Sequence, residues 1–194
     1  MRVKKENFVN GSCFHIYNHA VEHLNLFRVN NDYLRVLSKF KQKILTYPAT
    51  IFSYCLMPNH YHFFIRQDSD VPIYKIFNDI FSGYTLYYNH KYSRKGTLFR
   101  SPLQHKIIAT EEYFIRLSLY IHFNPVKSNL VKRPEDWIYS NYLEWIGERK
   151  GNLFNNEILK TYFENSVNYQ EDIKEHEKYV KEQQFGKLLL DFES

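Results

Sequence analysis

The strongest constraint on the fold is a pair of short runs, rich in β-branched and aromatic residues, that stand close together in the sequence. Thr50 to Leu56 and His60 to Arg66 both have the composition of β-strands. Only Met57-Pro58-Asn59 separates them, and this segment is a tight connection. We therefore predict that the two runs pair as an antiparallel hairpin.

The remaining apolar patterns divide the chain into alternating strands and helices. Further strand signals lie at residues 13–19 and 103–109. Apolar residues at helical spacing predict helices over residues 31–45, 73–88 and 110–124, the first capped by Asn31 or Asp32 and the last by Thr110. Pro48 stops the first helix, and Pro125 disfavours continuation of the third.

The resulting order β-α-β-β-α-β-α predicts an α+β fold, in which helices pack on a mostly antiparallel sheet. We assign residues 1–150 to this domain. Residues 151–194 form a separate C-terminal extension. We expect the extension to be helical, because residues 156–184 within it are mixed and charged in character.

Charge is distributed unevenly along the chain, whose formal net charge is +5. Basic residues exceed acidic ones over residues 1–150, whereas residues 151–194 are net acidic. A basic body indicates a polyanionic partner such as a nucleic acid. Tyr and Phe are abundant, and those not used in the core would suit stacking with the bases of single strands. Composition alone is equally compatible with an ordinary solvated surface.

Other features argue against several classes of protein. Cys13 and Cys55 are isolated, which disfavours a disulfide scaffold and a thiolate metal site. The charged N-terminus is not followed by an apolar stretch, so we expect no signal peptide. No apolar run approaches the ~20 residues that a membrane helix requires. We therefore expect a cytoplasmic protein with no membrane association.

The second strand of the predicted hairpin contains two histidines in alternate positions. Residues i and i+2 of a strand face the same side, so His60 and His62 project together while Tyr61 faces the opposite way. Two neighbouring imidazoles favour a divalent metal site. Pairs of histidines that are merely hydrogen-bonded or exposed have the same spacing, so this pattern alone leaves both interpretations open.

The last predicted helix carries a tyrosine and an amide on one face. Tyr120 and Asn124 are four residues apart, a spacing that brings them together along the helix. Asn124 can offer a carbonyl oxygen to a metal and Tyr120 a phenol, although a helical tyrosine by itself is far more often part of a core. His122 points to nearly the opposite side, and we interpret it as a structural residue or a DNA contact, not a ligand.

Together these motifs resemble a known family. The segment from Tyr54 to Ile65 (YCLMPNHYHFFI) is similar to the HUH segment of single-tyrosine transposases, in which two histidines flank a hydrophobic residue. Residues 120–131 (YIHFNPVKSNLV) resemble their catalytic helix, residues 14–19 (FHIYNH) their first strand and residues 96–100 (GTLFR) their basic loop. The resemblance is closest to the REP-associated tyrosine transposases and covers roughly residues 10–145.

The resemblance implies a ferredoxin-like or palm-like antiparallel sheet. It also implies that His60, His62 and Asn124 hold Mg²⁺ or Mn²⁺ while Tyr120 attacks single-stranded DNA. Attack would leave a 5′-phosphotyrosine that a second 3′-OH can resolve, so cleavage and strand transfer are one reaction run in two directions. The expected substrate is a single strand that contains a hairpin. Both a monomer and a homodimer remain open.

Basic side chains near these motifs are candidate phosphate contacts, which we expect to act collectively. They are Lys91, Arg94, Lys95, Arg100, Lys106, Lys127, Lys132 and Arg133.

The sequence is also compatible with two other interpretations. His19-Ala-Val-Glu22-His23 matches the HxxEH pattern of one metallopeptidase class, in which a helix carries two zinc ligands and a Glu base. The other is a non-catalytic protein on the same fold that binds hairpin DNA or RNA. A tyrosine buried far from both histidines would favour that second alternative.

Overall fold

The computed structural model describes residues 8–151, 153 and 166–181, which are built around a four-stranded sheet. The strands are β1 (Cys13–His19), β2 (Ala49–Met57), β3 (His60–Gln67) and β4 (Gln104–Ile108). They are ordered β2-β3-β1-β4, and every neighbouring pair is antiparallel. With helices in the connections, this is the ferredoxin-like arrangement of an α+β fold, and the expected fold class is confirmed.

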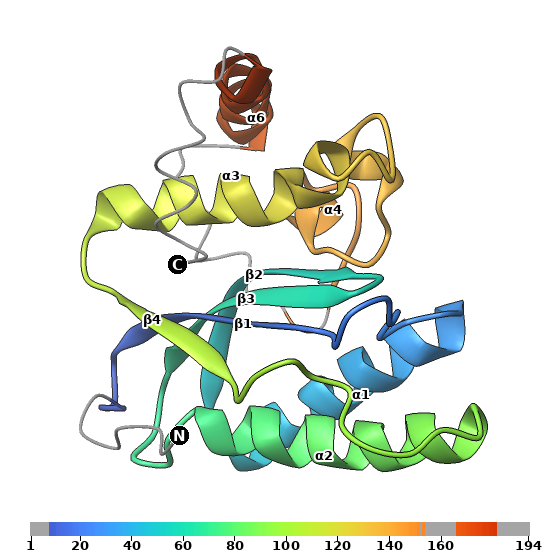
Figure 1. Ribbon diagram of the computed structural model, residues 1–194. Helices are drawn as coiled ribbons and strands as arrows, with labels where there is room; N and C mark the ends of the chain where they lie inside the picture. The colour runs from blue at the N-terminus through green and yellow to red at the C-terminus, as the bar shows by residue number, and fades with distance from the viewer. Residues whose placement is uncertain (1–7, 152, 154–165, 182–194) are drawn as a thin grey trace.

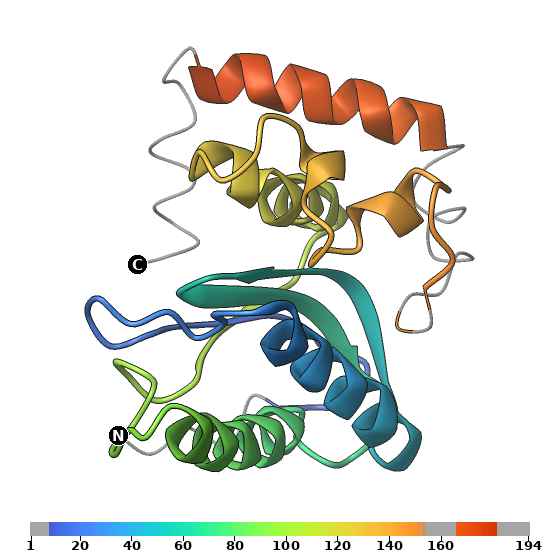
Figure 2. The same cartoon turned by 90° about the vertical axis from the view of Figure 1, so that its right-hand side faces the viewer.

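Helices cover both faces of the sheet (Figure 1). One face carries α1 (Asn30–Thr46) and α2 (Tyr74–Lys91), and the other carries α3 (Glu111–Lys127). The short helix α4 (Tyr142–Trp145) lies beside α3, and α6 (Ser166–Lys181) is the outermost helix, beyond α3, as Figure 2 shows from the side. A single 3₁₀ turn at Pro134–Asp136 precedes α4.

The predicted hairpin is confirmed, since β2 and β3 pair from Met57 opposite His60 onward. Both strands are almost entirely buried, because helices cover the sheet on each side. This double burial explains why the two runs are nearly continuous in apolar residues and do not alternate with polar ones.

The boundaries of two helices differ from those expected. α1 begins at Asn30, so Asp32 lies inside its first turn and does not cap it; its carboxylate accepts the backbone N–H groups of Arg28 and Val29. α3 continues through Pro125 to Lys127. A proline so close to a helix end removes only one hydrogen bond, and the next turn closes with Ser128 N–H donating to the carbonyl of Asn124.

The two faces of the sheet build separate cores. Between the sheet and α1 and α2 lies a large aromatic cluster that includes Phe40, Phe63 and Phe77. A smaller cluster lies between the sheet and α3 and includes Phe64 and Tyr120. Because neighbouring residues of β3 point to opposite faces, Phe63 and Phe64 belong to different cores.

The free edge of the sheet at β2 is covered by the segment that leads into α4. Leu56 N–H donates to the carbonyl of Tyr139, and Asn141 N–H donates to the carbonyl of Tyr54. Covering an edge in this way removes unpaired backbone groups that would otherwise attract another chain. It also fixes α4 relative to β2.

Part of the C-terminal extension is described, and it is helical as expected. Tyr169 and Ile173 of α6 pack against Leu119 and Phe123 of α3. The remainder of residues 156–184 lies outside the described residues, and the domain boundary at residue 150 stays a prediction. Within the described ranges, no helix has the length and apolar character needed to cross a membrane.

Candidate active site between α3 and the sheet

His60 and His62 lie on the face of the sheet that α3 covers. Their ring centroids are 5.0 Å apart, and the rings are nearly perpendicular. Tyr61 between them points to the opposite face, where its ring stacks on Phe81 of α2 at 4.3 Å. The alternation of β3 therefore separates two histidines from an aromatic core residue, as expected from the sequence.

β1 brings two more histidines to the same face. In the antiparallel register, His19 lies opposite His60, and their rings stack at 4.9 Å. His15 reaches His62 diagonally, with 3.0 Å between His15 Nε2 and His62 Nδ1. Reasoning from the sequence missed both contacts, although the alternate spacing of His15 and His19 was a visible signal. Only the strand register shows that they face His60 and His62.

Burial keeps the two innermost imidazoles neutral. His62 is fully buried, and this burial holds its pKa well below its usual range, with His60, His15 and His19 adding to the effect. Burial likewise lowers the pKa of His15 to about 3, with a smaller contribution from Lys106. A neutral imidazole keeps a lone pair for a metal or a proton.

Tyr120 stands directly over this pair of strands. Its ring centroid lies 5.4 Å from that of His62, edge to face, and 6.4 Å from that of His15. The side chain is only 1% exposed and packs in the core between α3 and the sheet. Lys127, two turns further along α3, places its ammonium 5.5 Å from the centre of the Tyr120 ring.

The polar atoms around Tyr120 fit a metal with nitrogen and oxygen ligands. Among the described residues, His62 Nε2 and Asn124 Nδ2 are buried without a hydrogen-bond partner. Buried polar atoms seldom remain unsatisfied, and the amide of Asn124 presents its oxygen at the same position when it is turned over. The described part of the chain contains no group of three His, Cys, Asp or Glu side chains that could hold a metal. The expected ligand set of His60, His62 and Asn124 is not a group of this kind, because its third ligand is an amide.

His122 has the structural role that was one of its two expected interpretations. Its Nε2 lies 2.9 Å from Asn141 Oδ1, and its Nδ1 lies 2.5 Å from the hydroxyl of Tyr169 on α6. Burial lowers the pKa of His122 to about 3, with Arg149 acting in the same direction and the hydrogen bond to Asn141 opposing it. The imidazole is therefore neutral, with one nitrogen toward each neighbour.

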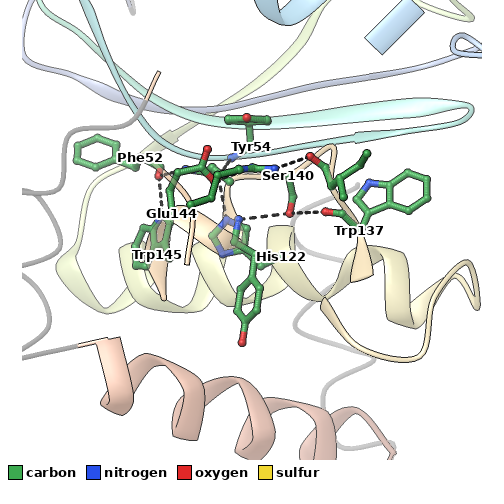
Figure 3. Close-up of polar contacts among 11 residues, drawn as sticks. Phe52, Tyr54, His122, Trp137, Ser140, Glu144 and Trp145 are labelled. Atoms are coloured by element: carbon green, nitrogen blue, oxygen red, sulfur yellow. Dashed lines mark hydrogen bonds and ion pairs between the residues drawn. The ribbon is translucent and has the colours of Figure 1, made fainter. Parts of the chain in front are cut away.

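Asn141 connects His122 to the backbone of the edge strand. Its side chain accepts the N–H of Tyr54 at 2.7 Å and donates to the carbonyl of Phe52 at 2.9 Å. Trp145 of α4 donates to the same carbonyl at 2.8 Å. Figure 3 shows His122, Trp145 and these two residues of β2 converging on one point. This network fixes the rotation and height of α3, and hence the position of Tyr120, over the sheet.

Three of the candidate phosphate contacts lie near Tyr120 or the histidines. Lys127 is beside Tyr120, as described above. Lys106 lies opposite His15 in the pairing of β1 with β4 and therefore shares its face. Arg100 lines a polar cavity of about 270 Å³ together with His19 and Asn59.

Other candidate phosphate contacts already have protein partners. The ammonium of Lys91 lies 2.7 Å from the fully buried carboxylate of Asp32, which gives this residue a structural partner, and its expected contact with DNA stays a prediction. Arg133 pairs with Asp136 at 2.8 Å, and Arg94 donates to the carbonyl of Gly96. Lys95 and Lys132 are exposed.

The structure contradicts the metallopeptidase interpretation of the HxxEH pattern. Residues 20–29 form a bridge, a turn and irregular loop, not a helix, and His23 has a positive φ of 60°. Two histidines at this spacing need a helix to bring both imidazoles to one metal. His19 instead ends β1 and stacks on His60.

Comparison with known proteins shows the family. No curated protein matches the chain. Among solved structures, a REP-associated tyrosine transposase bound to a REP hairpin has a similar fold: the TM-score is 0.62 and the sequence identity 17%, over 80% of this chain and 92% of that one. Residues 13–122, which include both histidines of β3 and Tyr120, match the IS200-like transposases. Because this match spans more than half of the sequence, the chain belongs to the IS200-like family of transposases.

Proposed function

We propose that this protein cleaves and rejoins single-stranded DNA, with Tyr120 as the nucleophile. One observation carries the proposal: the ring of Tyr120 lies 5.4 Å from the ring of His62, between a helix and a strand that come from distant parts of the chain. The ammonium of Lys127 is 5.5 Å from the same tyrosine. A phenol, a neutral imidazole and a cation are thereby gathered at one point, and DNA binding alone does not need this combination.

In this proposal His60, His62 and Asn124 hold a Mg²⁺ or Mn²⁺ ion. When bound, the ion polarises a non-bridging oxygen of the scissile phosphate and offsets its negative charge. His15 contacts His62 at Nδ1, which leaves Nε2 as the ligating atom and fixes the orientation of the ring. Imidazole and amide ligands are compatible with either ion and do not select between them.

The proposed reaction exchanges one phosphodiester bond for another. The phenol oxygen of Tyr120 attacks phosphorus, a bond from phosphorus to the tyrosine forms, and the bond to the 3′ oxygen of the preceding nucleotide breaks. The phenol loses one proton and the departing 3′ oxygen gains one, so the step is balanced. A second 3′-OH can attack the 5′-phosphotyrosine in the reverse sense and rejoin the strand without ATP.

Lys127 suits the charge that develops during this exchange. Attack places additional negative charge on the phosphate oxygens and on the tyrosine oxygen before it bonds to phosphorus. An ammonium next to the tyrosine ring stabilises that charge, and because Lys127 itself is exposed, water screens part of the effect. Lys127 therefore acts in this proposal as an electrostatic group and not merely as a surface contact for the DNA backbone.

The burial of Tyr120 adds a conformational requirement. The side chain is packed with Cys55, Met57 and Ile121 and is only 1% exposed. In this proposal a phosphodiester reaches the phenol only after the Tyr120 side chain leaves this packed position, a gating step of the kind that many enzymes use. The hydrogen bonds of His122 hold α3 in place meanwhile.

The proposed substrate is a single strand that contains a hairpin. The similar solved transposase is bound to such a hairpin, which supports the same class of partner for this chain. Arg100, Lys106 and Lys127 are the proposed phosphate contacts beside the site, and Arg94, Lys95, Lys132 and Arg133 are proposed to add to binding. Neutralising several of these residues should weaken binding and make its salt dependence shallower.

The experiment is a covalent-adduct assay with labelled hairpins taken from the DNA that flanks the gene. We expect a metal-dependent protein–DNA band on a denaturing gel, absent in Tyr120→Phe. Tyr113→Phe is the matched control, because Tyr113 lies on the same helix but is partly exposed and outside the site. An adduct that persists in Tyr120→Phe would reject Tyr120 while keeping the reaction class.

The burial of Tyr120 favours one alternative, a hairpin-binding protein without catalysis. Such a protein would bind the same DNA but form no adduct with either metal. The two functions separate cleanly: salt-dependent binding with no covalent band, over a broad set of hairpins, would replace the proposed chemistry with the binding function. Because the ring of Tyr120 lies close to that of His62, we favour catalysis over binding alone.

A further inference from the structure

A cavity of about 600 Å³ lies on the face of the sheet opposite Tyr120, between α2 and residues 96–103. Its inner wall is aromatic: Tyr61 and Phe81 stack in parallel at 4.3 Å, and Phe99 crosses the ring of Phe81 at 5.3 Å, nearly perpendicular to it. Tyr61 and Phe81 are almost fully buried and support Phe99, which is half-buried and presents the ring on which a base can stack.

The rim of this cavity is polar but uncharged. Asn78, Ser82 and Thr97 present amide and hydroxyl groups at its edge. Among the described residues that line the cavity, none is acidic, basic or a histidine. The lining therefore suits a flat, neutral group with hydrogen-bonding edges and not a phosphate or a metal ion. A nucleobase has this chemistry.

The wall formed by residues 96–103 is held in place by two amides. Asn89 of α2 donates to the carbonyl of Gly96 at 2.8 Å, and Asn18 of β1 donates to the carbonyl of Ser101 at 3.1 Å. Between these two anchors the backbone N–H of Val21 donates to the carbonyl of Leu98 at 2.9 Å. A preformed cavity of this kind binds a ligand with little loss of conformational freedom.

The same wall has cations along its other side. Phe99 lines the aromatic cavity, whereas the next residue, Arg100, lines the separate polar cavity with His19, whose ring stacks on His60. Arg94 and Lys95 precede the wall in the chain. A nucleotide with its base on the aromatic side would direct its phosphate toward the polar cavity, whose lining includes the cation Arg100 and the acidic Glu22.

One exposed apolar residue supports this occupancy. Leu86 of α2 is 74% exposed and stands at the edge of the cavity, where it contributes little to folding. A base inserted beside it would cover part of this surface.

We propose that this cavity binds one unstacked base from the single-stranded part of the DNA substrate. The inference rests on the proposed function for its ligand, and it adds a second point of recognition on the far face of the sheet. Contact with one base at a fixed distance from the active site would set which phosphodiester reaches Tyr120.

The test combines base removal with filling of the cavity, in full-length protein that carries Tyr120→Phe so that DNA is bound but not cut. The probes are the flanking hairpins, each with one abasic nucleotide at a different position. One position should weaken binding by roughly 5- to 100-fold, the range expected for loss of one stacked base. Ser82→Trp fills the cavity from an exposed helical position and should abolish that penalty while lowering the affinity for intact DNA.

Ser38→Trp is the control, because Ser38 is an exposed serine on α1 outside the cavity. It should keep both the affinity and the position-specific penalty. Equal binding of all abasic probes overturns the proposal, as does a penalty that Ser82→Trp leaves unchanged. The adduct assay with Tyr120 intact separates the two ideas: an adduct without a base-specific penalty rejects only the cavity, a penalty without an adduct rejects only the chemistry, and no DNA binding rejects both.

Discussion

The two faces of the sheet differ sharply although the same strands supply both. On the face toward α1 and α2, Phe63 stacks on Phe40 at 4.4 Å within an aromatic core. On the face toward α3, the preceding residue His62 is equally buried, yet one of its nitrogens has no hydrogen-bond partner among the described residues. One face satisfies its contacts, and the other leaves polar groups available for a ligand.

Side chains that stabilise the fold and side chains of the proposed site therefore come from neighbouring residues of the same strand. A shift of one residue in register would exchange the two sets of side chains completely. The aromatic face supplies the packing that holds β1 and β3 in register. The histidine face depends on that register, because His15 and His19 of β1 meet the two histidines of β3 only across strands. Mutations on the two faces should therefore have different consequences.

The largest effect should come from breaking the aromatic face. Phe63→Ala removes a fully buried ring and should lower the free energy of unfolding by about 3–5 kcal/mol. His62→Ala, its neighbour, removes a buried ring and leaves its contact with His15 unmade, and it should cost less, about 1–3 kcal/mol. Urea unfolding of both variants measures the difference. Equal destabilisation by the two substitutions would contradict the division between a packing face and a ligand face.

Binding of a metal should stabilise the protein through the histidine face alone. At roughly a hundredfold excess over its dissociation constant, Mn²⁺ should stabilise the wild type by about 2.7 kcal/mol through preferential binding to the folded state. His62→Ala and Asn124→Ala should lose this gain, because each removes a proposed ligand. Thermal unfolding with and without Mn²⁺ is the measurement. Tyr113→Phe serves as the control, and it should keep the gain because Tyr113 lies on α3 but is exposed and outside the site.

The pH dependence of stability should report the neutral state of His122. Its pKa falls from 6.5 to about 3 on folding, so below pH 6.5 the unfolded chain binds a proton that the folded chain does not. Stability due to this residue is therefore full above pH 6.5 and is lost as the pH falls toward 3. The loss between pH 6.5 and 5 should be about 2 kcal/mol.

His122→Asn tests this effect through the slope of stability against pH. The variant should be less stable than the wild type at pH 7, because it weakens the links to Asn141 and Tyr169. It should also lose less stability on acidification, because one buried imidazole is gone. Urea midpoints at pH 7 and pH 5 measure both quantities. An unchanged acid slope would show that His122 is not held neutral in the folded protein.

The smallest effect is expected at Lys127, which is compared with Lys91 because the sequence predicts both as phosphate contacts. Lys127→Ala should make the salt dependence of DNA binding shallower by about 0.7 in the logarithmic slope, the value for one phosphate contact on a single strand. Lys91→Ala should leave the slope unchanged, because Lys91 pairs with Asp32. It should instead destabilise the fold, since it leaves the buried carboxylate of Asp32 without its cation. A reduced slope in Lys91→Ala would return that residue to the DNA interface.

Local patterns in the sequence predicted most of the fold. The hairpin of β2 and β3 followed from strand composition and a short connection, and the three main helices followed from apolar spacing. Errors were confined to ends, as at Pro125, where a proline in the last turn removes only one hydrogen bond. The placement of His60 and His62 on one face and Tyr61 on the other was also predictable, because it depends on one strand alone.

Contacts between distant segments could not be predicted in the same way. His15 meets His62, and Lys91 meets Asp32, only because strand register and helix packing bring them together. Nothing in the local pattern distinguishes Lys91 from Lys127, although their partners differ completely. The burial of Tyr120 likewise depends on how α3 is held by His122, Asn141 and α6, which are far apart in the chain.

The most direct test of the central claim is to locate the covalent bond. Protein treated with Mn²⁺ and hairpin DNA would be digested with protease and nuclease, and the nucleotide-bearing peptide identified by mass spectrometry. Our account predicts a nucleotide attached through its 5′ phosphate to Tyr120, and none when metal is omitted. Attachment to another tyrosine, or no attachment although the DNA is bound, would contradict it.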